Sequence, residues 1–333
     1  MHSLTIVRQK KEWDSLWDQV NTPVYSSIYA TQRWVKNSTR LDKGTAELAV
    51  FRNDNGIIIH PYIRRDIPNT RMTDITSAFD FGGFWMSTQD PKHRQELMEG
   101  FCTHFDEYAW HNGIVSEFIR VFPWSTPPPA EHYNSTLVRD NVVIDLGLPP
   151  SRYWDGFSPS LRNNLRRSEE SGLTVRITSM KKFMYLYHQS TRDKGRDPYF
   201  LFPRPYFNTL MNKQGDSDTY CLGAYDLEGN LCSAHLYIID GTRLFYFLSA
   251  SNPTRLQHHP NHAIIWAIMN HFRSGFDYLY LGGGRPESLM RFKESFSPNR
   301  IPYYISTRVF DQEAYEYLEK AGESFPAYRK DLI

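Results

Sequence analysis

The spacing of apolar and polar positions changes several times along the chain and predicts a mixed α/β fold. Residues 47–64, ELAVFRNDNGIIIHPYIR, alternate on both sides of an Asn-Asp-Asn-Gly turn, and residues 219–239 alternate around Glu228-Gly229. Alternation around a glycine turn is typical of a β-hairpin, in which successive side chains face opposite sides of the sheet. We therefore expect one antiparallel hairpin in each half of the chain.

The segments that follow the two hairpins repeat in the same order. The first is followed by MTDITSAFDFGGFW, a helical pattern over 91–111, Gly113 and the strand pattern IVSEFIRVF. The second is followed by RLFYFLSASNP, the helical pattern NHAIIWAIMNHFRSG and the strand pattern FDYLYLGGG. Hairpin, strand, helix, glycine and strand thus occur twice, which indicates an internal duplication. The alternative is a chance recurrence of common α/β elements.

The length of the chain also favours two domains. Its 333 residues exceed one ordinary core, and 40% of them are hydrophobic, which supports packed globular domains. Prolines at 127–129 and 149–150 interrupt the pattern between the halves. We expect domain 1 over residues 1–140 and domain 2 over residues 141–307. Residues 308–333 should form a C-terminal strand and helix that packs back on domain 1.

Composition excludes several classes of protein. No apolar run approaches the ~18 residues that span a bilayer, and charges interrupt any signal-peptide core at the N-terminus. The three cysteines lack metal-site spacing and suit a reducing cytoplasm. A net charge of +1 argues against a general nucleic-acid coat protein. Basic residues outnumber acidic ones in residues 141–307, which suits either a polyanionic ligand or an ordinary solvated surface. We expect a cytoplasmic monomer.

A basic helix is predicted over the stretch SPSLRNNLRRSEESG. Ser158 suits its N-cap, Pro159 its first turn and Gly172 its end. Arg162 and Arg166 are four residues apart and so share one face. That face is either a solvated surface or a contact for phosphates, which the planar guanidinium fork binds well.

A long loop is predicted over TRDKGRDPYFLFPRPYF, residues 191–207. Arg192 and Arg204 lie in it among aromatic residues and prolines. Loops of this length often act as lids or substrate clamps, although a simple connection is equally compatible with the pattern.

Sequence motifs for covalent and metal catalysis are absent. The chain contains no G-x-S-x-G, no phosphate-loop lysine motif and no dinucleotide fingerprint at Gly282-Gly283-Gly284. His258, His259 and His262 lie close together in sequence, but we expect no metal there, with Asn261 capping the next helix. Catalysis by positioning and electrostatics remains, in which Lys293 could stabilise an oxyanion. The alternative is an exposed lysine on an amphipathic helix.

The chain carries motifs in both halves that resemble the Fem family of aminoacyltransferases. They are the strand end YLGGG, the block SLMRFKESFSP and the closing strand YYISTRVFD, with agreement also in YWDGFSPSLRNNLRRSEESGLTVRI, PNHAIIWAIMNHFRSGFDYLYL and TSAFDFGGFW. The resemblance implies two tandem GNAT-like domains with mixed sheets. The coiled-coil insertion of some Fem enzymes has no counterpart here, because no heptad run exists.

The resemblance implies transfer of an aminoacyl group from aminoacyl-tRNA to a primary amine. The acceptor would be a peptidoglycan precursor, a peptide or a natural-product intermediate. Lys293, with Phe292 beside it, falls on the family's F-K motif and would be catalytic. Arg162, Arg166 and Arg291 would contact phosphates of the tRNA. No bound cofactor is expected, because the acyl donor is a co-substrate.

The acceptor is expected between the FDFGG stretch of domain 1 and the FLSASN strand of domain 2. The residues assigned to substrate binding are Asp80, Phe81, Gly82, Gly83, Arg192, Arg204, Tyr246 and Ser249. Two departures from related patterns matter. The family's usual Y-G-Y-G-G-P is changed here, and Pro260, which has no N–H, replaces a glycine of the pyrophosphate loop of acetyl-CoA enzymes. The alternative function is a CoA-dependent N-acyltransferase for an amino sugar or small amine.

Overall fold

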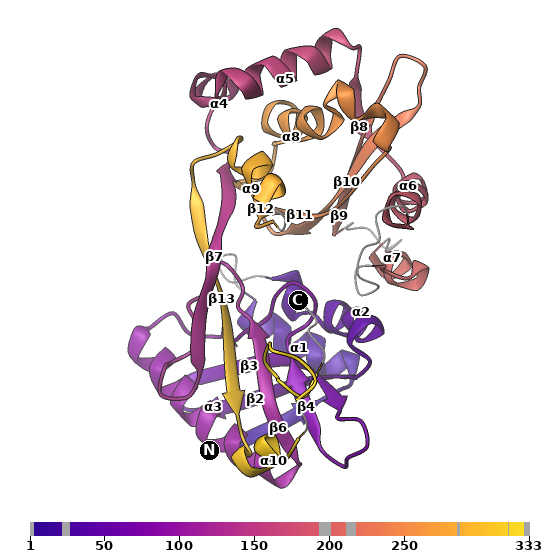
Figure 1. The fold of residues 1–333 in the computed structure, drawn as a ribbon. Helices are drawn as coiled ribbons and strands as arrows, with labels where there is room; N and C mark the ends of the chain where they lie inside the picture. Colours follow the sequence, from indigo (N-terminus) through magenta and orange to yellow (C-terminus); the bar gives the residue numbers. More distant parts are fainter. Residues whose placement is uncertain are drawn as a thin grey trace. The chain divides into compact units, whose positions relative to one another are not determined.

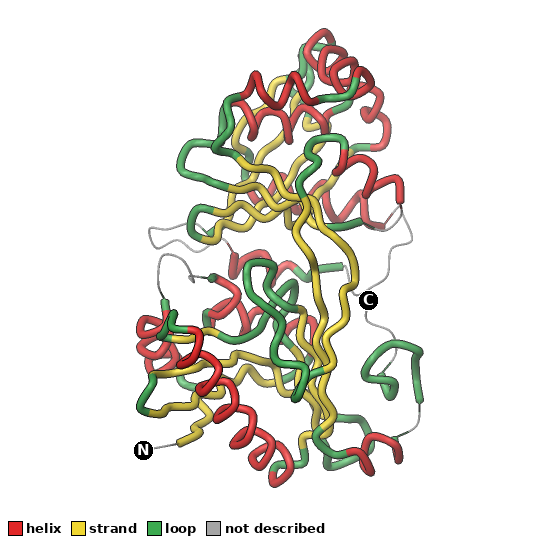
Figure 2. Tube along the Cα trace, turned by 90° about the vertical axis from the view of Figure 1, so that its left-hand side faces the viewer, coloured by secondary structure: helices red, strands yellow, loops and turns green. Residues whose placement is uncertain are grey.

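The computed structural model describes residues 3–21, 27–192, 201–210, 218–284, 287–318 and 320–329. The chain forms two compact units, which are treated separately below. Unit 1 comprises Met1–Arg139 and Pro302–Ile333, and unit 2 comprises Asp140–Ile301. Figure 1 shows the elements of each unit, and Figure 2 shows that strands form the centre of both.

Unit 1 is built on a mixed sheet in the order β1-β2-β3-β4-β6-β13. Neighbouring strands are antiparallel except β4 and β6, which are parallel. β2 and β3 form the expected hairpin, with Asn53 opposite Gly56. The strands are β1 (Ser3–Val7), β2 (Thr45–Asn53), β3 (Gly56–Asp66), β4 (Thr73–Thr76), β5 (Trp85–Met86), which pairs with β3, β6 (Ile114–Arg120) and β13 (Arg300–Val309).

Helices cover both faces of this sheet (Figure 1). α3 packs on one face, where Phe101 and Phe105 are fully buried among strand side chains. The apolar residues of α3 recur at helical spacing, which explains why this segment forms a helix that covers the sheet. The helices of unit 1 are α1 (Lys10–Val20), the 3₁₀ helix η1 (Ile28–Ala30), α2 (Gln32–Asp42), α3 (Pro91–His111) and α10 (Gln312–Tyr317).

Unit 2 repeats the plan with the strand order β7-β12-β11-β10-β9-β8. Here β11 and β12 are the parallel pair, and the other neighbours are antiparallel. The strands are β7 (Asn134–Asp145), β8 (Thr174–Ile177), β9 (Thr219–Tyr225), β10 (Leu231–Asp240), β11 (Arg243–Ser251) and β12 (Tyr278–Gly282).

Helices also cover the sheet of unit 2. α8 lies against β9 and β10, α5 lies over α8, and α6 packs against β10 and β11 (Figure 1). Ser158 caps α5 by accepting a hydrogen bond from the amide of Leu161, with Pro159 in the first turn, as the sequence predicts. The helices are α4 (Pro150–Gly156), α5 (Pro159–Glu170), α6 (Met180–Arg192), α7 (Arg204–Leu210), η3 (Pro253–His258), α8 (Pro260–Asn270) and α9 (Glu287–Glu294).

The internal duplication is confirmed by topology. In unit 1 a hairpin, β4, α3 and β6 follow one another, and in unit 2 a hairpin, β11, α8 and β12 do the same. In both units the strand after the hairpin pairs parallel to the strand after the helix. The fold class expected from the sequence, mixed α/β with two related domains, is therefore correct.

Two strands contain the boundaries between the units. β7 begins in unit 1 and its end pairs with β12 in unit 2, whereas β13 begins in unit 2 and pairs with β6 in unit 1. Residues 302–307, which the sequence placed in domain 2, thus lie in unit 1. The C-terminal segment also lies on unit 1, where Tyr328 and Ser116 share a hydrogen bond of 2.6 Å. Its helix is shorter than the pattern indicated, since α10 ends at Tyr317.

Within the described residues, no helix is long and apolar enough to cross a bilayer. The same residues contain no cluster of three His, Cys, Asp or Glu side chains that could hold a metal ion. Cys102, Cys221 and Cys232 are buried free thiols.

Candidate active site

The candidate site lies where β11 and β12 stop pairing. Among the described residues, their parallel pairing is confined to Arg243–Phe245 and Tyr278–Tyr280, although β11 continues to Ser251. β12 ends at Gly282, whose φ of +70° is a conformation that favours glycine. At Gly284 a Cβ atom would lie 3.0 Å from the backbone nitrogen of Met290 in α9. The glycines therefore let the chain turn out of a buried strand and bring α9 close to the strand end.

α9 directs Lys293 back toward this strand end. The side chain is only 6% exposed, and its Nζ donates a hydrogen bond of 2.5 Å to the carbonyl oxygen of Gly283. The same Nζ lies 5.2 Å from the centroid of the Tyr246 ring, a cation–π distance. Arg291, two residues earlier on α9, has a 64% exposed side chain. Lys293 is therefore not an ordinary surface lysine.

Tyr246 and Ser249, both predicted substrate residues, lie on the β11 segment beyond its pairing with β12. A bulge between Leu236 and Tyr237 shifts the register, so that Tyr246 lies opposite Tyr237 and Ser249 opposite His235. Directly opposed residues of an antiparallel pair share one face of the sheet. Both predicted residues therefore share a face with His235, and Tyr246 also contacts Lys293. Their role in substrate binding stays a prediction.

A buried polar network that the sequence analysis missed lies beside Tyr246. His235 is fully buried, its Nε2 is 2.9 Å from Oδ1 of Asn261, and its ring lies edge-on to Tyr246 at 4.9 Å. Ser233 and Ser251 also donate to that amide oxygen, at 2.6 and 3.1 Å. Asn261 was expected to cap α8, but His259 occupies the N-cap and Pro260 the first turn. The Asn261 side chain instead joins α8 to β10 and β11.

His235 is held neutral at physiological pH. Its pKa is lowered to about 4, mainly by burial and to a smaller extent by the charge of Lys293, which together outweigh the opposing effect of the hydrogen bond to Asn261. Its Nδ1 lies 2.9 Å from the hydroxyl of Tyr237. Both ring nitrogens thus have hydrogen-bond partners within the described residues. We call Lys293, Gly283, Tyr246 and His235 the lysine site.

Phe292 and Arg291 have different surroundings from Lys293. The Phe292 ring is half-buried and packs perpendicular to His262 of α8 at 4.8 Å and against Phe296 at 5.5 Å. It therefore anchors α9 to α8. Arg291 forms an ion pair of 2.8 Å with the exposed Glu287 one turn earlier. A catalytic role for Phe292 and a tRNA contact for Arg291 stay predictions.

Arg162 and Arg166 do share one face of α5, and both contact Trp154. Arg162 donates to the Trp154 carbonyl oxygen at 3.3 Å, and the Arg166 guanidinium lies 5.7 Å from the tryptophan ring centroid. Arg166 is exposed and Arg162 half-buried. The contacts explain how α5 packs beside α4, and phosphate binding by this face stays a prediction.

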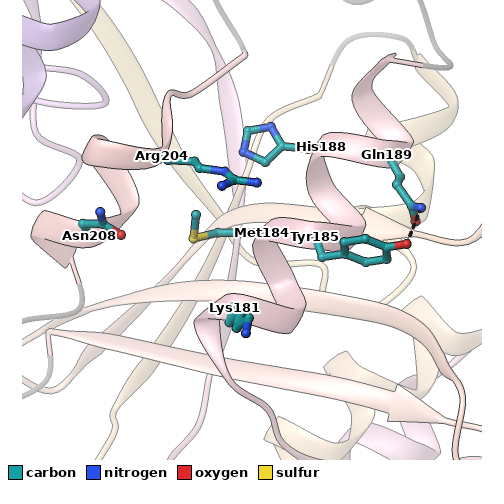
Figure 3. Close-up of a pocket in the computed structure, with 7 residues that line it drawn as sticks. All are labelled: Lys181, Met184, Tyr185, His188, Gln189, Arg204 and Asn208. Carbon is teal, nitrogen blue, oxygen red and sulfur yellow. Dashed lines mark hydrogen bonds between the residues drawn. The ribbon is translucent and has the colours of Figure 1, made fainter.

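Arg204 lies away from Lys293, in a pocket between α6 and α7. Figure 3 shows it reaching from α7 toward His188 of α6, and Lys181 and Tyr185, also from α6, line the same pocket. The pocket has a volume of about 720 Å³, and its remaining lining residues are Met184, Gln189 and Asn208. None of the described side chains that line the pocket is acidic. The side chain of Arg192, which was also predicted to bind substrate, lies outside the described residues.

In unit 1 the predicted stretch Asp80–Gly83 is tightly packed. Phe81 is 6% exposed, and its ring packs edge-on against Tyr29 at 5.1 Å, so it belongs to the core. The amide of Gly82 donates to Arg120 at 2.8 Å, and its carbonyl accepts from Phe122 at 3.0 Å. Asp80 is half-buried with a φ of +69°, which is uncommon for a residue other than glycine. Of the four residues Asp80–Gly83, only Asp80 has a charged side chain, and its role in substrate binding stays a prediction.

The first turn of α8 offers few donors for a pyrophosphate. Pro260 has no N–H, and the amides of His262 and Ala263 both donate to the carbonyl oxygen of His259, at 3.1 and 3.2 Å. An acetyl-CoA loop needs several such amides directed at the phosphates. Burial lowers the pKa of His262 to about 4, so this neutral imidazole adds no positive charge at neutral pH.

Residues 157–294 match the family model of an acetyltransferase (GNAT) domain. The match contains the whole lysine site. No curated protein matches the chain in sequence.

The whole chain is similar in structure to FemX. The two chains are 13% identical with a TM-score of 0.69, over 96% of this chain and 100% of FemX. L-PGS from Bacillus licheniformis is also similar, at 11% identity and a TM-score of 0.55, over 90% of this chain and 92% of that one. So is the C-terminal domain of a putative lysylphosphatidylglycerol synthetase from Agrobacterium fabrum, at 14% and 0.54, over 88% and 92%. These likenesses confirm the predicted resemblance to Fem proteins at the level of the fold.

Proposed function

We propose that the chain transfers an aminoacyl group from aminoacyl-tRNA to a primary amine. The observation that carries the proposal is the buried Lys293, whose Nζ lies at the carbonyl of Gly283 and over Tyr246. An ammonium group in a low-dielectric site stabilises negative charge far more than it would in water. Lys293 is therefore assigned to the oxyanion that forms when the ester carbonyl is attacked.

The reaction needs no covalent enzyme intermediate. The amine nitrogen attacks the ester carbon, a C–N bond forms, and the C–O bond to the ribose breaks. The proton lost by the amine goes to the departing ribose oxygen, which restores the hydroxyl of the tRNA. The chain's part is to align the two substrates and to stabilise the oxyanion, which accounts for large rate enhancements without a nucleophilic side chain.

Two further observations support a tRNA donor over CoA. The first turn of α8 has few amides left for a pyrophosphate, and FemX and the lysylphosphatidylglycerol synthetase proteins share the fold. The exposed Arg166 and Arg291 and the half-buried Arg162 are assigned to phosphates of the tRNA. Arg204, in a pocket whose described lining residues include no acidic one, is assigned with Tyr246 and Ser249 to the substrates. The acceptor is an amine of a peptidoglycan precursor, a peptide or a natural-product intermediate.

The second candidate is a CoA-dependent N-acyltransferase for an amino sugar or small amine, which the match to an acetyltransferase (GNAT) domain favours. The two candidates are separated by incubating the protein with labelled aminoacyl-tRNA or labelled acetyl-CoA and a panel of amines. We expect transfer of label from aminoacyl-tRNA to an amine in an amide product. Transfer from acetyl-CoA alone would replace the proposed function with the second candidate.

A further inference from the structure

A buried hydrogen-bond network in unit 1 holds the glycines of the predicted acceptor stretch. His60 on β3 is fully buried, with its Nδ1 2.8 Å from the carbonyl oxygen of Gly83 and its Nε2 2.5 Å from Oε1 of Glu117 on β6. The other carboxylate oxygen of Glu117 accepts a hydrogen bond of 2.8 Å from the hydroxyl of Tyr133. The His60 ring also stacks on Phe84 at 4.5 Å.

The partners of His60 determine its hydrogen bonding. The Gly83 carbonyl can only accept, so Nδ1 of His60 carries a proton and donates it. Nε2, on the other side of the ring, is held by the carboxylate of Glu117. With both side chains at most 1% exposed, removal of either partner leaves a buried polar group unsatisfied. The bond to Gly83 is therefore well determined.

The hydrogen bond from His60 to Gly83 holds a stretch of backbone whose conformation is already restricted. Gly83 has a φ of +140°, a conformation in which a side chain would be strained, and both polar backbone groups of Gly82 are already paired. Asp80 precedes these glycines with its own unusual φ of +69°. Backbone conformations of this kind persist where the surroundings hold them, and they cluster at functional sites.

We propose that His60 and Glu117 are positioning residues for the acceptor. They hold the carbonyl of Gly83, and through the Gly82-Gly83 backbone they set the orientation in which Asp80 receives the neutral primary amine that attacks the ester. A carboxylate is suited to that ligand, because it accepts a charge-assisted hydrogen bond from an amine N–H. The inference rests on the proposed function and names the residues that select the acceptor.

The sheet of unit 1 contains a matched control. Glu47 is also 1% exposed and accepts a hydrogen bond of 2.9 Å from the buried Tyr62 hydroxyl, as Glu117 does from Tyr133. Its other partner is Arg8, on the segment after β1, and not the glycine stretch. Tyr62→Phe keeps the ring, which packs on His60 at 5.4 Å, and removes only the hydroxyl. It therefore disturbs the same sheet and the same kind of hydrogen bond without removing a hydrogen bond to Gly83.

The first experiment compares acceptor kinetics in three variants. His60→Phe keeps a ring on Phe84 but removes both nitrogens, and we expect the KM for the amine acceptor to rise about ten-fold, with the KM for aminoacyl-tRNA within about two-fold. Glu117→Gln should stay near wild type, because its amide can donate to Nε2 while Nδ1 still reaches Gly83. Tyr62→Phe should leave the acceptor KM unchanged. An equal rise in Tyr62→Phe and His60→Phe, or no rise in either, overturns the proposal.

The second experiment is independent of activity. Hydrogen exchange of the amides at 83–85 should be faster in His60→Phe than in Tyr62→Phe, and equal rates overturn the positioning role. If wild type transfers no aminoacyl group, the proposed function fails while this measurement still decides the inference. If His60→Phe does not fold, Tyr133→Phe is compared with Tyr62→Phe in both assays, with the same order expected.

Discussion

Lys293 and Gly283 are joined by a hydrogen bond of 2.5 Å across the turn that separates β12 from α9. The bond places the ammonium group at the end of β12, the strand that precedes α9 in the chain. A Cβ atom at Gly282 would lie 3.7 Å from Nζ, an ordinary van der Waals distance, so the ammonium group lies directly beside the last residue of the strand. The glycine run and the lysine thus act together: Gly284 lets α9 approach the strand end, and α9 places a positive charge there.

Replacing Lys293 tests whether its positive charge is needed for aminoacyl transfer. Lys293→Met keeps most of the apolar stem and removes the charge, and we expect kcat for aminoacyl transfer to fall about 10²–10³-fold, the loss typical of an oxyanion donor. Arg291→Met removes a positive charge from the same helix at an exposed position and should cost less than about three-fold. The measurement is a single-turnover rate with saturating aminoacyl-tRNA. A Lys293→Met enzyme with full activity would contradict the assigned role.

Tyr246 is expected to act through its ring. In Tyr246→Phe the aromatic face remains over Nζ, and activity should stay within about two-fold of wild type. In Tyr246→Leu the cation–π contact is lost, and a fall in kcat of about five- to thirty-fold follows from a contact worth about 1–2 kcal/mol. The same kinetic assay checks both variants. Equal losses in the two variants would show that the hydroxyl, and not the ring, matters.

The fold was predictable because its signals are local. Alternation around Gly56 and around Glu228-Gly229 marks the two hairpins, and the block SLMRFKESF marks α9 with Lys293. These patterns depend on neighbours in sequence, so they needed no knowledge of long-range register. Repetition of the same order of elements then sufficed to infer two related domains.

The polar networks were not predicted, because their members are far apart in sequence. His235 meets Asn261, and His60 meets Glu117, only through sheet register and the packing of α8. One signal was present: Ser233, His235 and Tyr237 occupy alternate positions of an otherwise apolar strand, and so form a polar stripe on one face. The burial of Phe81 was not predicted either, because it depends on packing against Tyr29, which is distant in sequence.

Gly284 is expected to tolerate no side chain. In Gly284→Ala the added methyl would lie 3.0 Å from the Met290 amide nitrogen and 2.9 Å from Cγ of Leu289, so α9 must shift. We expect a loss of about 1–3 kcal/mol in the free energy of unfolding and lower activity, because Lys293 moves with α9. Gly156→Ala is the control, since a Cβ there meets no atom within 4 Å. Urea unfolding measures both variants, and equal stabilities would contradict the close approach.

The buried histidines predict that unit 2 loses stability in mild acid. Burial lowers the pKa of both His235 and His262 to about 4, below the ordinary value of 6.5. Between these values the unfolded chain binds more protons, so stability is full above pH 6.5 and falls as the pH drops. Each histidine contributes about 2 kcal/mol between pH 6.5 and 5. Urea unfolding at several pH values should show a shallower pH dependence in His235→Asn, and an unchanged slope would contradict the assignment.

Arg329 is expected to fix the C-terminal segment to unit 1. Its guanidinium donates to both oxygens of Asp74, at 2.5 and 2.9 Å, and to the carbonyl of Asp66 at 2.9 Å. Asp74 is fully buried and has Arg65 as its second partner. Removing one of the two guanidinium groups from a buried carboxylate costs about 3–5 kcal/mol when nothing replaces it, and Arg65 should reduce this to about 2. We therefore expect Arg329→Met to lower the free energy of unfolding by about 2 kcal/mol.

The exposed pair of Arg300 with Glu294 is the control, and Arg300→Met should cost less than about 1 kcal/mol. Equal losses in the two variants, measured by urea unfolding at neutral pH, would show that the C-terminal ion pair contributes no more than a surface one.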